Sequence, residues 1–454
     1  MKLSDLRVQN GMRINTKVQS TPSMTFERLR GFRDMFPEDA EPKFFMLNLA
    51  DQVASSFGFQ RIDMPSLEPL ELYKLKSGEE LVSQTFSFVD KGGREVTMIP
   101  EATPSVVRML TSRKDLPRPV KWYCYPKLWR YEEPQSGRLR EHIQFNADIF
   151  GPNTPDADAE IIGLAASILD RIGLEGEYSV RINDRKLMES LLKGMGTEDI
   201  MATFSVIDKF KKISREEFTS QLEERGFPEG RIPDLIWLME NPGDFTELRS
   251  SIERVVVMDE NLAGIIGRLE ETLSLAGKYT NSKLIIDFSV VRGLSYYTGI
   301  VFEVFDINGE FRSILGGGRY DNLSKLLADQ EIPAVGFGMG DVVIEMLARR
   351  QGLWNVPNRP IRFSVCVASD KAREYSLDIS LKLRGAGHIA SMDISRRSLS
   401  AQLKNASIQG YDYAVIIGNR ELENSEVTLR NLSTGEQESM NESIMLEKAG
   451  NLKK

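Results

Sequence analysis

The sequence predicts a mixed α+β protein: an antiparallel sheet flanked by helices, a helical insertion, and a separate α/β domain at the C-terminus. Three observations lead to this prediction. Short strand-like segments before residue 150 are joined by turn residues such as Lys91-Gly92-Gly93, which favours antiparallel pairing. Residues 185–278 are charged and helical in period. Beyond a proline-containing linker at 353–360, strands and helices alternate as in a small α/β domain.

The first elements follow from local patterns. A helix is expected from Pro37, because proline suits the first helical turn, and Gly58 ends it. Apolar residues recur every four positions and predict its buried face: Phe45, Leu49, Val53 and Phe57. Alternating residues predict strands at 59–64, 85–89, 95–99, 122–130 and 142–150, and a further helix is expected at 158–172.

Two glycine-rich runs follow the insertion. Strands are expected at 283–290 and 299–307, and Gly316-Gly317-Gly318 is expected to form a turn after them. A second glycine-rich turn, 336–340, leads into a helix from about Asp341. In the last domain we expect strands at 363–368, 388–392 and 413–417, with helices at 371–384 and 399–408.

These patterns divide the chain into five parts. We expect a weakly ordered extension at 1–25 and a central domain formed by 26–184 and 279–352. The helical insertion, 185–278, interrupts this central domain. The linker at 353–360 precedes a last domain at 361–454.

Composition restricts the class of protein. The chain has 41% hydrophobic and 27% charged residues, typical of a globular protein, and no apolar run approaches the roughly 20 residues that cross a bilayer. Its two cysteines, Cys124 and Cys366, are too few for a disulfide framework and are expected to be buried thiols in a reducing cytoplasm. With only two histidines, His142 and His388, no metal site is expected. The net charge of -8 leaves nucleic-acid binding to local basic patches.

Residues 142–150 form the most informative predicted strand. Its polar face comprises His142, Gln144, Asn146 and Asp148. An ordinary half-exposed strand has the same alternation. A basic hairpin precedes it, however, because residues 113–140 carry eight Lys/Arg and three Asp/Glu. Arginine binds phosphate bidentately, so the combination favours a ligand pocket, although a solvated cationic hairpin would carry the same charge.

A second stretch, 292–299, places Arg292 beside Tyr296 and Tyr297 between glycines, which is typical of a polar pocket. Residues 336–340 resemble part of a dinucleotide-binding fingerprint. The bulky Phe337 and Met339, and the absence of regular strand–helix alternation, argue against Rossmann-type binding. No Walker-type lysine motif is present, and neither histidine has a recognisable catalytic partner.

Seven segments in this order resemble the histidyl-tRNA synthetases, a family of class II aminoacyl-tRNA synthetases. The resemblance runs from about Phe26 to the C-terminus through residues 30–34, 100–103, 129–132, 145–151, 292–299, 316–321 and 336–340. It implies a six-stranded antiparallel catalytic sheet, a homodimer interface, the helical insertion and a C-terminal anticodon-binding domain. It also implies a cytoplasmic ligase that activates histidine with ATP and Mg²⁺ and transfers it to tRNA(His).

The resemblance assigns roles to individual residues. Arg130 and Arg292 match the two arginines that act on the α-phosphate, and Glu132 matches an acid near the adenine, so these three are expected to bind ATP. The remaining matches concern histidine and tRNA. Glu101, Thr103 and Gln144 match contacts to the α-amino group, Asp148 and Tyr297 match contacts to the imidazole with Tyr296 beside them, and Gln135 and Arg138 fall in a loop that meets the tRNA acceptor end.

One position departs from the class II pattern. The usual Gly-x-Glu-Arg is Gly340-Asp341-Val342-Val343 here, so Val343 replaces the arginine that binds the terminal phosphate of ATP. The change slightly favours an alternative, the synthetase-like regulatory subunit of ATP phosphoribosyltransferase. Arg130, Arg292 and the C-terminal domain favour the synthetase. A class II enzyme for glycine, threonine or proline would share the last domain, but Asp148 with Tyr296-Tyr297 disfavours it.

Overall fold

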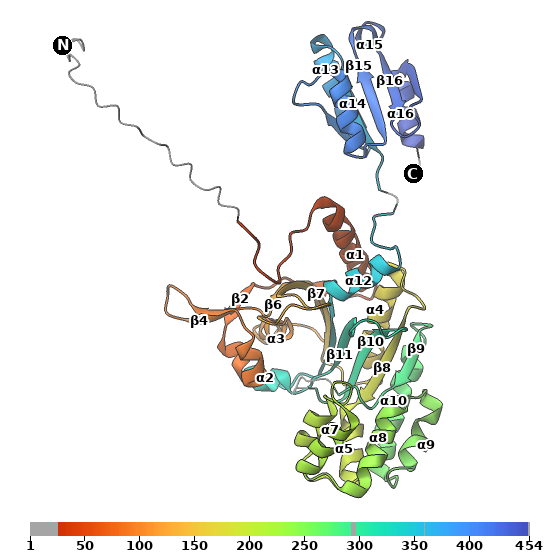
Figure 1. Cartoon of the computed structure of the whole chain (residues 1–454). Helices are drawn as coiled ribbons and strands as arrows, with labels where there is room; N and C mark the ends of the chain where they lie inside the picture. The colour runs from red at the N-terminus through yellow and green to blue at the C-terminus, as the bar shows by residue number, and fades with distance from the viewer. Residues whose placement is uncertain (1–25, 292–296, 358, 453–454) are drawn as a thin grey trace, which may run out of the picture. The chain divides into compact units, whose positions relative to one another are not determined.

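The computed structural model describes residues 26–291, 297–357 and 359–452 (Figure 1). The chain forms two compact units that divide between Trp354 and Asn355. Each unit has its own sheet and its own hydrophobic core. None of the helices in the described ranges is long and apolar enough to cross a membrane.

A nine-stranded sheet forms the centre of the first unit, counted over the described residues. Its six central strands are antiparallel, in the order β5 (Val120–Cys124), β7 (Glu141–Phe150), β12 (Ala334–Gly340), β11 (Leu315–Arg319), β10 (Ile300–Asp306) and β8 (Tyr178–Asp184). The expected six-stranded antiparallel sheet is therefore confirmed. Parallel strands extend it on both sides, β1 (Gln60–Arg61) beside β5 and β9 (Lys283–Ile286) beside β8, and β6 (Lys127–Trp129) pairs with β7.

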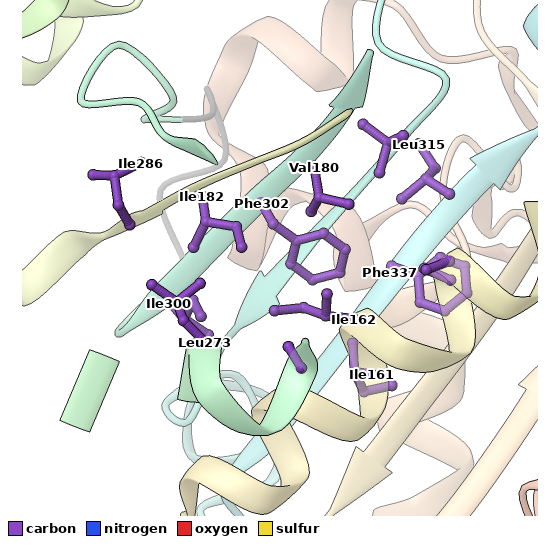
Figure 2. Packing of buried hydrophobic residues seen from close by; sticks show 14 of the residues in the cluster. Ile161, Ile162, Val180, Ile182, Leu273, Ile286, Ile300, Phe302, Leu315 and Phe337 are labelled. Carbon is purple, nitrogen blue, oxygen red and sulfur yellow. The ribbon is translucent and has the colours of Figure 1, made fainter. Parts of the chain in front are cut away.

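Helices α1 (Pro37–Ser56), α4 (Pro155–Ile172) and α10 (Glu260–Ala276) build the main core with one face of this sheet. Figure 2 shows Ile161 and Ile162 of α4 packed toward Val180 and Phe302 of the sheet. Helix α4 begins where the Thr154 side chain accepts the N–H of Ala157, and it ends at Gly173 with φ +100°. Burying each large apolar side chain contributes about 1.5–3 kcal/mol to the free energy of folding. The contact between these helices and the sheet therefore stabilises the first unit.

The buried face of α1 lies one position from the predicted one. Its buried residues are Pro42, Met46, Ala50 and Ala54, whereas Leu49, Val53 and Phe57 are only partly buried against the core. Small alanines let α1 approach α4 closely, and the larger residues lie at the edges of the contact.

The insertion is helical, as expected, and connects β8 to β9. Its helices are α5 (Arg185–Gly194), α6 (Ile200–Ile207), α7 (Arg215–Glu224), α8 (Ile232–Glu240), α9 (Leu248–Glu253) and α10, with short 3₁₀ turns at Glu229–Arg231 and Phe245–Glu247. Among the residues that the structure describes, two ion pairs join it to the rest of the unit. Arg268 lies 3.0 Å from Asp158 of α4, and Lys211 lies 3.0 Å from Asp287 after β9.

Two groups of predicted elements are wrong. The glycine runs 316–318 and 336–340 are not turns but lie inside strands β11 and β12. The predicted strand 122–130 is two strands, because Pro126 lacks the N–H that a continuous ladder needs. A smaller sheet of β2 (Leu67–Pro69), β4 (Glu95–Met98) and β3 (Ser87–Val89) accompanies α2 (Glu71–Ser83), α3 (Thr103–Thr111) and α11 (Leu323–Ala328), and α12 (Asp341–Arg350) follows β12.

The second unit is an α/β domain, as expected. Strands β14 (Ile389–Met392), β13 (Arg362–Val367) and β15 (Tyr413–Ile417) are parallel, and β16 (Glu426–Asn431) and β17 (Gln437–Asn441) extend the sheet antiparallel. The main helices are α13 (Arg373–Gly385), α14 (Leu399–Ile408), α15 (Asn419–Asn424) and α16 (Glu442–Asn451). Both cysteines of the chain are free and buried, as expected, Cys124 on β5 and Cys366 on β13.

Candidate active site

The register of the six central strands places two rows of residues on the sheet face opposite α4. The first row is Trp122, Asp148, Gly336, Gly318, Val301 and Asn183, in order across β5, β7, β12, β11, β10 and β8. The second row, in the same order of strands, is Cys124, Asn146, Gly338, Gly316, Glu303 and Arg181. Each row therefore has two glycines at its centre, with Asp148 beside them in the first row and Asn146 and Glu303 beside them in the second.

The four central residues Gly316, Gly318, Gly336 and Gly338 form a surface that we call the glycine floor. A Cβ at Gly336 would lie 2.0 Å from Asp148 Oδ1, and a Cβ at Gly338 would lie 1.8 Å from Gln144 Nε2. A Cβ at Gly318 would lie 2.9 Å from the ring of Tyr297. The floor lacks side chains because three residues predicted to contact histidine, Gln144, Asp148 and Tyr297, occupy that space.

Asp148 is held by a neighbour that sequence reasoning did not assign to the site. The hydroxyl of Tyr320 donates to Asp148 Oδ1, and both side chains are almost fully buried. Burial, and next the negative charge of Asp148, raises the pKa of the Cys124 thiol well above its ordinary value. In the sequence, the position of Tyr320 within the 316–321 motif is the feature that indicates a role in the site. Arg319 in the same motif is structural, since it pairs with Asp158 at 2.7 Å and with Asp321 at 3.0 Å.

Asn146 is a second residue that sequence reasoning did not select. It lies between Gln144 and Asp148 on the polar face of β7, and only 3% of its surface is exposed. Its Oδ1 atom is buried and has no hydrogen-bond partner in the structure. Buried polar atoms normally have partners, so this acceptor is available to a donor on a ligand.

Arg130 lies next to the segment that carries Glu101 and Thr103. Its Nε donates to the carbonyl of Pro100 at 2.8 Å, and the adjacent Trp129 donates its backbone N–H to Ile99 at 3.0 Å. Glu101 and Thr103 are 6% and 8% exposed, and Thr103 begins α3. The structure thus brings together the residues predicted to contact the α-amino group and the α-phosphate.

A cavity of about 270 Å³ extends from the basic hairpin to the glycine floor. Of the predicted residues, Arg130, Glu132 and Arg138 line it, and Glu132 lies 2.9 Å from Arg138. The remaining walls include His142 of the predicted polar strand face and Val343 of the altered class II motif, together with residues that sequence reasoning did not assign a role there: Glu303, Arg312, Gly316 and Gly338. Arginines from the basic hairpin and from the connection between β10 and β11 therefore line one hollow, which is the arrangement expected for a polyphosphate site.

His142 lies on the wall of this cavity as a neutral side chain. Burial lowers its pKa to about 4, and the positive charge of Arg130 contributes to the shift. The ring is therefore uncharged at neutral pH, and it adds no repulsion against Arg130.

The predicted tRNA-contacting residues lie on a tight turn of the hairpin. Gln135 and Arg138 exchange backbone hydrogen bonds of 3.1 and 2.9 Å around Gly137, whose φ of +75° favours glycine. Both side chains are exposed. Arg292 and Tyr296 lie outside the described residues. Among the residues that the structure describes, no group of three or more His, Cys, Asp or Glu side chains could hold a metal ion.

Comparisons with known proteins agree with this geometry. The model of the histidyl-tRNA synthetase family matches residues 31–341, and the model of an anticodon binding domain matches residues 362–451. A histidine–tRNA ligase of Thermoplasma volcanium is 52% identical over 91% of this chain and 96% of its own length. One of Picrophilus torridus is 51% identical over 92% of this chain and 98% of its own length. The structure of a Nostoc histidyl-tRNA synthetase has the same fold, with a TM-score of 0.80 at 23% identity over 94% of this chain and 99% of that one.

The antiparallel sheet, its arginine-lined cavity and the separate anticodon-binding domain define an aminoacyl-tRNA synthetase, a ligase that uses ATP as a substrate. Within that class, the chain belongs to the histidyl-tRNA synthetase family.

Proposed function

We propose that the protein is a histidine–tRNA ligase. It condenses histidine with ATP to histidyl-adenylate and pyrophosphate, and then transfers the histidyl group to the terminal ribose of tRNA(His). The observation that carries the proposal is the glycine floor. Gln144, Asp148 and Tyr297 lie directly over it, and two of its glycines, Gly316 and Gly338, line the adjoining cavity together with Arg130.

Recognition of histidine requires a partner for each imidazole nitrogen, because a neutral imidazole has one donor and one acceptor. Asp148 accepts from one nitrogen, while Tyr320 holds the carboxylate in orientation. Tyr297, with Tyr296 beside it, contacts the other nitrogen. Glu101, Thr103 and Gln144 bind the α-ammonium group, and the free Oδ1 of Asn146 adds an acceptor beside them. A site that pairs polar groups in this way rejects analogues lacking them by roughly 10⁴-fold.

Adenylation needs the carboxylate of histidine held in line with the α-phosphorus and the phosphate charge stabilised. Arg130 contributes to both, because its Nε is fixed by the carbonyl of Pro100 and leaves its remaining N–H groups for the ligand. Arg292 is the second arginine that acts on the α-phosphate. Glu132, oriented by Arg138 at 2.9 Å, contacts the adenine. Mg²⁺ enters as part of the MgATP substrate.

Transfer to tRNA uses surfaces outside the cavity. Gln135 and Arg138 contact the acceptor end from the exposed turn of the hairpin, and the second unit binds the anticodon.

The enzyme is a cytoplasmic homodimer that associates through residues 26–36 and α1. Large apolar side chains are exposed there, among them Phe26 at 92%, Leu29 at 71% and Phe36 at 64%, as expected of a surface that a partner covers.

The decisive experiment is ATP–pyrophosphate exchange measured separately with each amino acid. We expect exchange with histidine alone, and we expect the variants Arg130→Ala and Arg292→Ala to lose it while retaining their thermal midpoint. Exchange at the wild-type rate in Arg292→Ala would refute its role. Absence of exchange with every amino acid would instead favour the alternative function, a regulatory subunit of ATP phosphoribosyltransferase. No observation on the described residues favours that alternative.

A further inference from the structure

Arg312 is the one arginine on the cavity wall whose role neither the motifs nor the mechanism above explains. It lies between β10 and β11, whereas Arg130 and Arg138 belong to the basic hairpin. Its Nη2 donates to Gln135 Oε1 at 3.0 Å, a neutral amide. In the part of the chain that the structure describes, no carboxylate lies within ion-pair distance of Arg312.

The surroundings of Arg312 favour an anion. Partial burial lowers its pKa, and the neighbouring positive charge of Arg138 lowers it further. Glu132 is the carboxylate closest to both arginines of the hairpin, and it is already bound to Arg138 at 2.9 Å. The positive charges of Arg138 and Arg312 repel each other unless an anion lies between them. The cavity supplies the space for that anion.

Arg312 also lies beside Val343, the position at which this sequence lacks the arginine of the class II pattern. A Cβ built on Gly137 would contact Val343 Cγ2 at 3.4 Å and Arg312 Cδ at 3.7 Å, so both side chains meet over the same glycine. Val343 is in the first turn of α12 and 7% exposed, and its apolar side chain packs in the core. Val343 and Arg312 therefore approach the same corner of the cavity from different elements.

We propose that Arg312 binds the terminal phosphates of ATP and so replaces the cation that the sequence lacks at Val343. In the first step a carboxylate oxygen of histidine bonds to the α-phosphorus. The bond from the α-phosphorus to the bridging oxygen breaks, and pyrophosphate leaves with the electron pair. Arg312 stabilises the charge on that leaving group. This inference rests on the proposed function, because it assigns a residue to the same reaction.

The test compares Arg312→Ala and Arg312→Gln with wild type in the full-length protein. We expect the KM for ATP in pyrophosphate exchange to rise about 10- to 100-fold, as loss of a charge-assisted hydrogen bond to phosphate predicts. The KM for histidine and the inhibition constant of AMP, which lacks the terminal phosphates, should change by less than about twofold. Arg215→Ala is the matched control. Arg215 is a surface arginine of the insertion paired with Glu240 at 3.2 Å, and it should leave all three constants unchanged.

A compensating variant sharpens the assignment. Arg312→Ala combined with Val343→Arg restores a guanidinium to the same corner from α12, and we expect it to recover at least part of the affinity for ATP. Val343→Leu in the same background should not. An unchanged KM for ATP in Arg312→Ala would overturn the proposal. So would a raised KM for tRNA with an unchanged KM for ATP, because Arg312 would then bind the acceptor-end phosphate.

Failure of the proposed function would be recognised separately. If the wild-type protein shows no exchange with any amino acid, calorimetric titration with ATP and with AMP still tests Arg312. A loss of affinity for ATP alone in Arg312→Ala would support its role at the terminal phosphates. An equal loss for both nucleotides, or none, would refute it.

Discussion

At the scale of the residue, Asp148 is the side chain that we propose sets the specificity of the site. It is 2% exposed, it accepts from Tyr320, and it lies over Gly336 of the glycine floor. A buried carboxylate of this kind has little freedom to take a new partner. In the proposed function this carboxylate accepts a hydrogen bond from an imidazole N–H.

We therefore expect Asp148→Ala to raise the KM for histidine about 100-fold, because a charged hydrogen bond contributes about 1.5–3 kcal/mol. The KM for ATP should change little, since Asp148 does not line the arginine-rich cavity. Steady-state pyrophosphate exchange measures both constants. Glu253→Ala, at an exposed position of the insertion, is the control. An unchanged dependence on histidine would contradict the assignment.

His142 makes stability depend on pH. Its pKa is about 4 in the folded protein because of burial and Arg130, and about 6.5 in an unfolded chain. Below pH 6.5 the unfolded state binds the proton more strongly, so folding loses up to about 3 kcal/mol as pH falls from 6.5 to 4. Above pH 6.5 neither state is protonated and the effect vanishes. Thermal midpoints should fall more steeply with acid in wild type than in His142→Gln, and parallel curves would show that His142 is not responsible.

At the scale of elements, the glycines of β11 and β12 serve two faces of one sheet. Gly317 faces the core, where a Cβ would lie 2.3 Å from the carbonyl of Gly336 and 2.6 Å from Phe337 Cβ. Gly338 faces the site, where a Cβ would meet the flexible end of Gln144. Substitutions at these two positions, which lie on neighbouring strands but on opposite faces of the sheet, should thus fail for different reasons.

We expect Gly317→Ala to lower the thermal midpoint, because backbone atoms would have to move. Overpacking of this kind costs about 1–3 kcal/mol. Gly338→Ala should keep a near-native midpoint but raise the KM for histidine at least about 10-fold by displacing Gln144, as loss of a charged contact implies. Calorimetry and exchange kinetics separate the two effects. Gly264→Ala, on α10 with open space around it, should alter neither. The idea fails if both glycine variants behave alike.

The limits of sequence reasoning are clearest in these same strands. Alternation correctly predicted β7 and its polar face, because one buried face and one polar face leave a period of two. Glycine has no side chain to show which face it occupies, so 316–318 and 336–340 were interpreted as turns. Arg312 was missed because its neighbours, Gln135, Gly137 and Val343, are distant in the sequence, and only the folded sheet brings them together.

At the scale of the whole molecule, the two units have independent cores. The first is built from two clusters around the nine-stranded sheet, and the second has a cluster of its own between Ile361 and Ala449. In the proposed function, amino-acid activation and anticodon binding therefore belong to parts of the chain that fold by separate hydrophobic contacts.

A chain ending at Trp354 is thus expected to fold and to catalyse histidine-dependent pyrophosphate exchange within about threefold of the full-length rate. Charging of tRNA(His) should fall by at least about 100-fold, because the anticodon contacts contribute several kcal/mol to tRNA binding. Exchange and aminoacylation assays on the same preparation measure the two activities. If exchange and charging are lost together in a folded fragment, the second unit has a role in activation itself.

The connection from β8 to β9 has a consequence for how this fold varies. These strands are parallel neighbours at one edge of the sheet, so the helical insertion is simply the crossover between them. Its entry and exit points are fixed beside each other, while the six antiparallel strands pair without it. The helices before α10 can therefore change in length or sequence during evolution without shifting the register that creates the glycine floor, whereas α10 is retained because it packs in the main core.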